Sequence, residues 1–147
     1  MINVAVNGAA GRMGRRVIQT INGTPGCRLV CALERADHPD LGTEAGVLAG
    51  IGDLGVAVQR HMTGSPDVLI DFSSPAGCLD RARECADNGV GMVIGTTGLS
   101  EDQEREIEQN IASRIPVLMA PNMGLGVNLL FKLVTTVAAA VGEDFDI

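Results

Sequence analysis

The residues whose type and spacing point most clearly to chemistry are three glycines near the N-terminus. Gly8, Gly11 and Gly14 are spaced three apart between an apolar run and an amphipathic helical pattern. Strand, tight turn and helix in that order form an anion site, because glycine permits close backbone approach and the helix start presents free N–H groups. This predicts dinucleotide binding, in which Gly8 makes the turn, Gly11 admits the pyrophosphate and Gly14 packs the helix on the sheet.

An ordinary glycine-rich βα turn produces a similar pattern, and the spacing G-x-x-G-x-x-G differs from the commoner G-x-G-x-x-G. Glu34 favours the dinucleotide interpretation. It ends the next apolar run, twenty positions after Gly14. A carboxylate at this place accepts hydrogen bonds from the hydroxyls of an adenosine ribose.

Arg35 follows Glu34, so this strand end carries both signs of charge. The carboxylate favours a free 2′-hydroxyl and the guanidinium pairs with a 2′-phosphate, each bond contributing about 1.5–3 kcal/mol. We therefore expect both NADH and NADPH to bind. A solvated ion pair is the alternative. Arg12, at the helix start, is either a further phosphate ligand or an ordinary exposed arginine.

Two later segments are candidates for contact with a nicotinamide. Gly95-Thr96-Thr97-Gly98 follows a strand pattern and offers backbone N–H groups and two hydroxyls, and Ala120-Pro121-Asn122-Met123 follows another strand pattern. A plain turn explains each segment almost as well. We interpret His38 and His61 as surface histidines rather than catalysts. We find no convincing nucleophile, pair of carboxylates or metal cluster in the sequence, and expect no bound metal.

The scaffold for these residues follows from the apolar pattern. Strand patterns alternate with helical patterns along the chain, which predicts an α/β fold with a Rossmann-like, doubly wound parallel sheet. The carboxyl ends of parallel strands share one edge of the sheet, so the candidate segments should line one crevice. The expected strands are 2–7, 28–34, 56–58, 68–72, 91–94 and 116–120, and the crevice segments are Gly8–Gly14, Glu34-Arg35, Phe72-Ser73, Gly95–Gly98 and Ala120–Met123.

Local signals predict where the helices begin and end. Asn22-Gly23 predicts the end of a helix that starts near Arg12, and Ser74-Pro75 predicts the start of a helix over 75–88. Ser100 with Gln103 forms a capping box for a helix ending near Ser113. Residues 35–55 are interpreted as a long, polar, glycine-rich connection. A last helix carries an apolar stripe from Val127 to Val141, which predicts packing against a substantial surface.

Composition narrows the function classes. The 147 residues carry a net charge of −7, with no Trp, no Tyr and three Phe, so an aliphatic core suited to buried parallel strands is expected. The negative charge disfavours nucleic-acid binding. The sequence shows neither a membrane-spanning run nor a basic leader, so we expect no membrane attachment and a cytoplasmic location. Cys27 and Cys31 fall on one face of a strand, and all four cysteines are interpreted as buried structural thiols.

Five segments together resemble the 4-hydroxy-tetrahydrodipicolinate reductase family, also called dihydrodipicolinate reductase, of the diaminopimelate route to lysine. They are Val6–Gly14, Leu33–Arg35, Ile70–Ser73, Val93–Gly98 and Ala120–Met123, and the resemblance runs in order from Met1 to Ile147. It implies hydride transfer from NADH or NADPH to a cyclic dicarboxylate. It also implies that pyrophosphate is bound by Gly8, Ala9, Ala10, Gly11, Arg12 and Met13. Glu34 and Arg35 would contact the adenosine ribose, and the nicotinamide would be surrounded by Gly95, Thr96, Thr97, Ala120, Pro121, Asn122 and Met123.

The resemblance also suggests a division of the chain. Residues 1–121 would form the NAD(P)-binding domain, and 122–147 the hinge and first helix of a substrate domain that makes the full-length enzyme a homotetramer. In the family a His-His-x-x-x-Lys motif and an Asp-Ala-Pro-Ser-Gly-Thr loop follow the position of Ile147. We therefore expect the catalytic residues to lie beyond this chain, which by itself would bind the cofactor without turnover. Gly124 replaces a common Ser, removing a possible helix cap.

Two alternatives stay open. One is another NAD(P)-dependent oxidoreductase, such as a semialdehyde or homoserine dehydrogenase. The other is a nucleotide-sensing module that carries out no chemistry. An active-site Cys in a longer reading frame would favour a semialdehyde dehydrogenase, whereas a His-His-x-x-x-Lys run would exclude both dehydrogenases.

Overall fold

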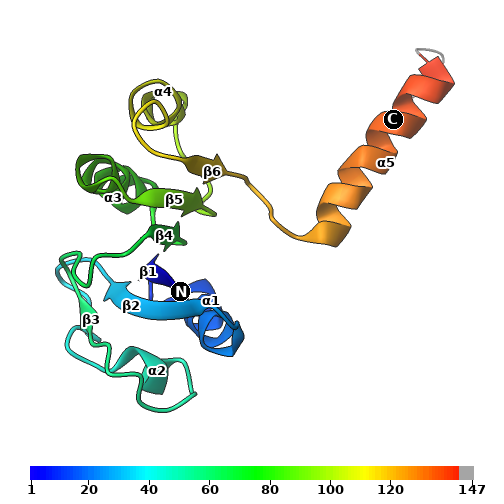
Figure 1. Cartoon of the computed structure of the whole chain (residues 1–147). Coiled ribbons are helices and arrows are strands. Elements are labelled where there is room, and N and C mark those ends of the chain that lie inside the picture. The colour runs from blue at the N-terminus through cyan, green and yellow to red at the C-terminus, as the bar shows by residue number, and fades with distance from the viewer. Residues whose placement is uncertain (143–147) are drawn as a thin grey trace.

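The computed structural model describes residues 1–142 and is built around one six-stranded sheet with the order β3-β2-β1-β4-β5-β6 (Figure 1). Every pair of neighbouring strands is parallel. The order reverses beside β1, as in a doubly wound sheet, so the predicted Rossmann-like fold is confirmed. The strands are β1 (Ile2–Asn7), β2 (Cys27–Leu33), β3 (Val58–Gln59), β4 (Val68–Asp71), β5 (Gly91–Ile94) and β6 (Val117–Met119).

Helices cover both faces of this sheet. Helices α1 (Arg12–Gly23) and α2 (Ala45–Leu48) lie on one face. Helix α3 (Pro75–Asn88) and the π-helical turn η1 (Ile107–Ile111), which continues α4 (Glu101–Glu106), lie on the other. Helix α5 (Leu125–Val141) follows β6. One aliphatic cluster joins the sheet to α1 and α2, and a second joins it to α3 and η1. Because strands buried on both faces need apolar side chains in either direction, a core of Ala, Val, Leu, Ile and Cys suits this architecture.

The local capping signals are confirmed for two helices. The Ser74 hydroxyl accepts a hydrogen bond from the N–H of Gly77 at the start of α3, and Gly89 ends that helix in the left-handed conformation, with φ of 69°. Ser100 and Gln103 form the reciprocal capping box at the start of α4. These signals depend on residues within one helical turn, so sequence alone was enough to place them.

Two helix ends differ from expectation. Helix α1 continues through Asn22-Gly23 and ends at Thr24, which is extended; the glycine with positive φ is Gly26, in the turn that follows. The helix expected to reach Ser113 is α-helical only to the end of α4 and then widens into η1. The sequence pattern correctly located both helices but not the geometry of their last turns.

The connection 35–55 contains the short helix α2, which the sequence pattern did not predict. The carboxylate of Glu44 organises it by accepting hydrogen bonds from the N–H groups of Val47 (2.7 Å), Leu54 (2.9 Å) and Val56 (3.2 Å). These hydrogen bonds keep the pKa of Glu44 below its usual value, against the opposing effect of desolvation. A helix of four residues is too short to show a period, so its signal lay in the cap rather than in apolar spacing.

A register shift in β2 changes the expected placement of two cysteines. Val4 pairs with Leu29 but Ala5 pairs with Cys31, so β2 holds one extra residue between these pairs. A bulge of this kind moves the following side chains to the opposite face. Cys31 therefore packs in the cluster beside α3, whereas Cys27 packs against the cluster beside α1. The prediction that both thiols share one face was wrong.

Helix α5 extends away from the sheet (Figure 1). None of its residues is buried, and Leu125, Leu130 and Phe131 expose 86%, 57% and 55% of their surface. The expectation that its apolar stripe packs against a substantial surface is therefore not met within residues 1–142. As expected from Gly124, the first turn of α5 lacks a side-chain cap. No helix in this part of the chain is long and apolar enough to cross a membrane.

Candidate nucleotide-binding cleft

The glycine turn after β1 is fixed by the two neighbouring strands. Gly8 adopts a φ of 76°, and the N–H groups of Gly8 and Ala9 both donate to the carbonyl of Leu33, at 3.0 and 3.1 Å. A Cβ on Gly8 would lie 2.4 Å from the carbonyl oxygen of Phe72. Glycine is thus required here both for its backbone conformation and because the end of β4 leaves no room for a side chain.

Gly14 lies where α1 approaches the end of β1, in keeping with its predicted packing role. A Cβ at this position would lie 2.1 Å from the Gly8 carbonyl oxygen and 2.7 Å from the Cα of Ala9. Gly14 therefore allows the first turn of α1 to lie against the glycine turn at the end of β1. Gly11 is less crowded, since its nearest atom is the Gly8 oxygen at 3.1 Å from an added Cβ.

Glu34 links the turn to the end of β2. Its carboxylate Oε1 accepts a hydrogen bond from the N–H of Ala10 at 3.1 Å, and its Oε2 accepts one from the N–H of Arg35 at 3.3 Å. The side chain is buried. Each carboxylate oxygen has a further lone pair for an incoming donor. Glu34 therefore shapes the phosphate-binding turn and retains the capacity to accept hydrogen bonds from a ribose.

A cleft of about 810 Å³ opens beside these residues, at the carboxyl ends of β1, β2 and β4. Four predicted site residues line it: Gly8, Gly11, Glu34 and Arg35. The expected Phe72-Ser73 segment also lies on its wall, and His38 and His61, interpreted as surface residues, both line it. The cleft thus lies where a doubly wound sheet binds its ligands.

Helix α3 and the end of β3 add charged side chains that sequence reasoning missed. Arg60 enters the cleft wall from the segment after β3, while Asp80, Arg81 and Glu84 enter from α3. Arg81 and Glu84 form an ion pair with each other. The spacing from Gly77 through Arg81 to Glu84 is that of one helical face, so the sequence contained a signal for the contribution of α3.

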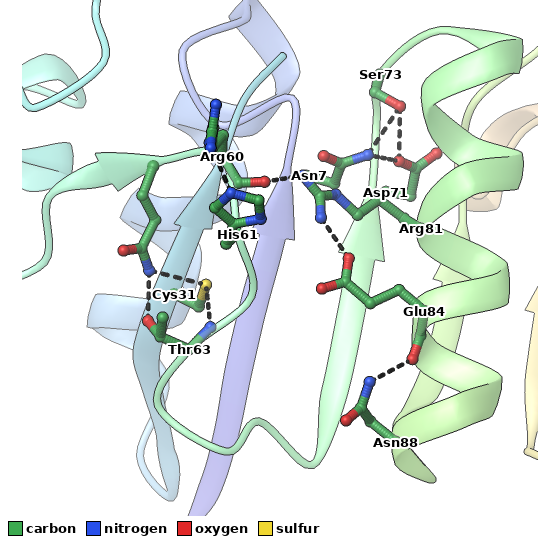
Figure 2. Close-up of polar contacts among 11 residues, drawn as sticks. Asn7, Cys31, Arg60, His61, Thr63, Asp71, Ser73, Arg81, Glu84 and Asn88 are labelled. Carbon is green, nitrogen blue, oxygen red and sulfur yellow. Dashed lines mark hydrogen bonds and ion pairs between the residues drawn. The ribbon is translucent and has the colours of Figure 1, made fainter. Parts of the chain in front are cut away.

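A buried polar cluster ties the ends of three strands together, and Figure 2 shows its Asn7, Asp71 and Ser73 side chains. Asp71 at the end of β4 is completely buried, and its Oδ1 accepts hydrogen bonds from Asn7 Nδ2 at 2.6 Å and from Ser73 Oγ at 2.7 Å. Its Oδ2 accepts one from Thr96 Oγ1 at 2.5 Å. Burial of a carboxylate is tolerated where several donors satisfy it. The sequence signal was a polar residue at the end of each buried strand.

Gly95 and Thr96 have structural roles in this arrangement. The Thr96 hydroxyl, besides its bond to Asp71, accepts a hydrogen bond from the N–H of Ser73 at 2.8 Å, so it is turned into the protein. A Cβ on Gly95 would lie 2.2 Å from the ring of Phe72, which means that glycine here makes room for the ring. Thr97, the next residue, is exposed.

The cleft does not include every predicted segment. Gly95–Gly98 and Ala120–Met123 follow β5 and β6 at the same sheet edge but do not line the cleft, so the expectation of a single crevice was too broad. Arg12 and Met13 line a separate depression between α1 and α2. Contact of these residues with a cofactor stays a prediction.

Two thiols beneath the cleft are buried in α3. Burial is the main cause that raises the pKa of Cys78, and the nearby carboxylate of Asp71 raises it further. Burial is also the main cause that raises the pKa of Cys85 to about 12, with a smaller contribution from Glu84. Both thiols therefore stay protonated at neutral pH, which suits a packing role. Within residues 1–142 no group of three or more His, Cys, Asp or Glu side chains is arranged to hold a metal ion.

Comparison with known proteins places these features in a family. The family model described as "Dihydrodipicolinate reductase, N-terminus" matches residues 2–123, which include the glycine turn, the cleft and all six strands. The chain belongs to the dihydrodipicolinate reductase family. The resemblance noted from the sequence motifs is therefore confirmed.

Curated relatives in this family are named 4-hydroxy-tetrahydrodipicolinate reductase. Those from Citrifermentans bemidjiense and Geobacter sp. strain M21 are each 44% identical over 150 residues, covering 100% of this chain and 56% of the relative. The protein from Anaeromyxobacter sp. strain Fw109-5 is 43% identical, with 55% of its length covered. The chain thus spans about half the length of the curated relatives it matches.

Solved structures agree with this assignment. A dipicolinate-bound dihydrodipicolinate reductase from Paenisporosarcina sp. TG-14 superposes with a TM-score of 0.75 and 28% identity, covering 95% of this chain and 54% of that one. An aspartate semialdehyde dehydrogenase from Candida albicans has a TM-score of 0.60 and 14% identity, covering 83% of this chain and 43% of its own. The second likeness shows a shared fold and nothing further.

Proposed function

We propose that this chain is the NAD(P)H-binding part of a reductase that converts 4-hydroxy-tetrahydrodipicolinate to tetrahydrodipicolinate in lysine biosynthesis. The observation that carries the proposal is the glycine turn, held by Gly8 and Gly14 and joined to Glu34 beside the cleft. The names of the relatives supply the reaction.

The residues present fit a dinucleotide. Gly8 and Gly11 line the cleft and carry no side chain there, so a pyrophosphate can reach the N–H groups at the start of α1. Glu34 and Arg35 would hold the adenosine ribose, and Gly95–Thr97 with Ala120–Met123 would hold the nicotinamide. The bound nicotinamide supplies the hydride; the chain's own residues bind and orient it.

The wider organisation belongs to the same proposal. Residues 1–121 would be the cofactor domain, and 122–147 the hinge and first helix of a substrate domain. The end of the family match at residue 123 and the exposure of α5 support this division. The family resemblance further implies a cyclic dicarboxylate substrate, a homotetrameric full-length enzyme, a cytoplasmic location and no membrane partner. The acidic charge of the chain argues against a nucleic-acid partner.

Titration of the 147-residue chain with NADPH and NADH tests the proposal. The chain has no Trp or Tyr, so the fluorescence of the reduced nicotinamide itself can be followed without protein background. We expect saturable binding of both cofactors, competed by an excess of either one. Failure of both to bind at millimolar concentration would overturn the assignment of the site.

A further inference from the structure

Arg60 lies next to Glu34 because the two strands that precede them are paired. β2 and β3 are parallel with Leu33 opposite Gln59, so Glu34 and Arg60 are the first residues past the ends of neighbouring strands. The N–H of Glu34 donates to the carbonyl of Gln59 at 2.9 Å, which extends this pairing by one step. Arg60 is thus placed beside the carboxylate assigned to the ribose, although the two are 26 positions apart in sequence.

The backbone of Arg60 is also held from the other side. Arg81 of α3 donates a hydrogen bond from its guanidinium to the carbonyl of Arg60 and forms an ion pair with Glu84 (Figure 2). The main chain at Arg60 is therefore held between β2 and α3, which fixes the position of its Cα at the cleft.

The guanidinium of Arg60 has unused donors. Its Nε donates to Nε2 of His61 at 2.6 Å, while its two terminal nitrogens have no partner among residues 1–142, and no carboxylate there lies within 4.0 Å of it. The two other arginines of the cleft are already paired, Arg35 with Asp37 and Arg81 with Glu84. Of these three cleft-lining arginines, Arg60 is therefore the one whose charge has no carboxylate partner.

A guanidinium that has no carboxylate partner and lies beside the carboxylate assigned to a ribose is suited to one ligand group in particular. Its planar pair of N–H donors matches the oxygens of a phosphate, and its charge offsets the repulsion between Glu34 and a phosphorylated ribose. We propose that Arg60 binds the 2′-phosphate of NADPH and is a determinant of cofactor preference in this cleft. This inference rests on the proposed function, because it assumes that the adenosine ribose lies at Glu34.

The test compares Arg60→Gln with Arg28→Gln, a matched loss of one exposed arginine at the amino-terminal end of β2. Each protein is titrated with NADPH, with NADH, and with 2′,5′-ADP and 5′-ADP as probes that differ in the 2′-phosphate. We expect Arg60→Gln to lower affinity for NADPH and 2′,5′-ADP about 5- to 20-fold, with NADH and 5′-ADP changed less than about twofold. Arg60→Lys should restore part of the loss, and Arg28→Gln should behave as the wild type.

The other outcomes distinguish a failure of the Arg60 assignment from a failure of the proposed function. If Arg60→Gln leaves NADPH unchanged, or weakens NADPH and NADH equally, the assignment of Arg60 to the 2′-phosphate is wrong while cofactor binding stands. If the unaltered chain binds none of the four probes, the proposed function fails and this inference fails with it. A thermal melt of each variant checks that an equal loss for all probes does not arise from unfolding.

Discussion

At the scale of single residues, Glu34 combines a structural contact with a predicted ligand contact. Its carboxylate accepts the N–H of Ala10, which is otherwise buried in the glycine turn, and it lies beside Arg35 and Arg60 at the cleft. A buried donor without a partner is costly, whereas a change of charge alone preserves the hydrogen bond. The two roles can therefore be separated by two substitutions at one position.

Glu34→Gln keeps an oxygen for the N–H of Ala10 but removes the negative charge. We expect its affinity for NADPH relative to NADH to rise about three- to tenfold, because repulsion of a 2′-phosphate is lost. Glu34→Ala leaves the Ala10 donor unpaired and should lower the free energy of unfolding by about 1–3 kcal/mol while weakening both cofactors. Urea unfolding and cofactor titration measure these effects; an alanine variant as stable as the wild type would contradict the structural role.

At the scale of the elements, the sequence predicted features whose interacting residues lie close together along the chain. The start of α3 at Ser74 and the capping box at Ser100 were readable because their partners lie within one turn. The register shift in β2, and hence the face taken by Cys31, depends on pairing with β1 and left no local mark. Helix α2 was missed for a different reason: its cap at Glu44 and Val47 is local, but four residues are too few to show an apolar period.

The contact between α1 and the glycine turn yields a prediction at this scale. Gly14→Ala places a methyl group 2.1 Å from the Gly8 oxygen, a backbone atom that cannot move without distorting the turn. We expect a loss of about 1–3 kcal/mol in stability, together with weaker binding of both cofactors. Gly23→Ala, in the same helix with nothing within 4 Å of the added methyl, is the matched control and should be neutral or slightly stabilising. Equal behaviour of the two variants in urea unfolding would refute this account.

The buried thiols of α3 predict an alkaline dependence of stability. The pKa of Cys85 is raised from 9.0 to about 12 by burial, and that of Cys78 is raised by burial and by Asp71. A raised pKa in the folded state means that the unfolded state loses its proton first as the pH increases. The contribution of these thiols to the free energy of unfolding is therefore fully present below pH 9. It is lost as the pH rises from 9 towards 12, by up to about 1.4 kcal/mol per pH unit for each thiol.

The chain is well suited to this measurement, since it has no Tyr and only one Lys. Urea unfolding between pH 7 and about pH 10.5 should show a falling free energy above pH 9. The double variant Cys78→Ala, Cys85→Ala loses apolar packing and starts lower, but its free energy should fall less steeply with pH. Identical slopes for the two proteins would show that these thiols do not govern the alkaline limb.

At the scale of the whole molecule, the parallel sheet and the inner part of the cleft could be predicted because both follow from alternation of elements and from the glycine turn. The outer part of the cleft could be predicted only in part. The helical spacing of α3 held a signal for Arg81, whereas Arg60 reaches the cleft through the pairing of β3 with β2. For Thr96, by contrast, the sequence suggested a ligand contact at a hydroxyl that is used within the protein. Its hydroxyl looked available in sequence, but the buried carboxylate of Asp71 competes for it.

The sheet and its cleft should not depend on helix α5 for their stability. None of its residues is buried, and a 17-residue helix without tertiary contacts is only marginally stable in water. We therefore expect a chain that ends at Met123 to bind NADPH within about twofold of the full chain and to unfold with a free energy within about 0.5 kcal/mol of it. Cofactor titration and urea unfolding of the two proteins measure this.

The same comparison tests what the apolar side of α5 does in solution. Leu129, Leu130 and Phe131 each expose more than half of their surface, and apolar patches of this kind promote association. Sedimentation should therefore show concentration-dependent self-association of the 147-residue chain that is absent from the chain ending at Met123. A loss of more than about tenfold in cofactor affinity on shortening would contradict the independence of the cleft. It would mean that α5 packs on the sheet in solution, as its apolar stripe first suggested.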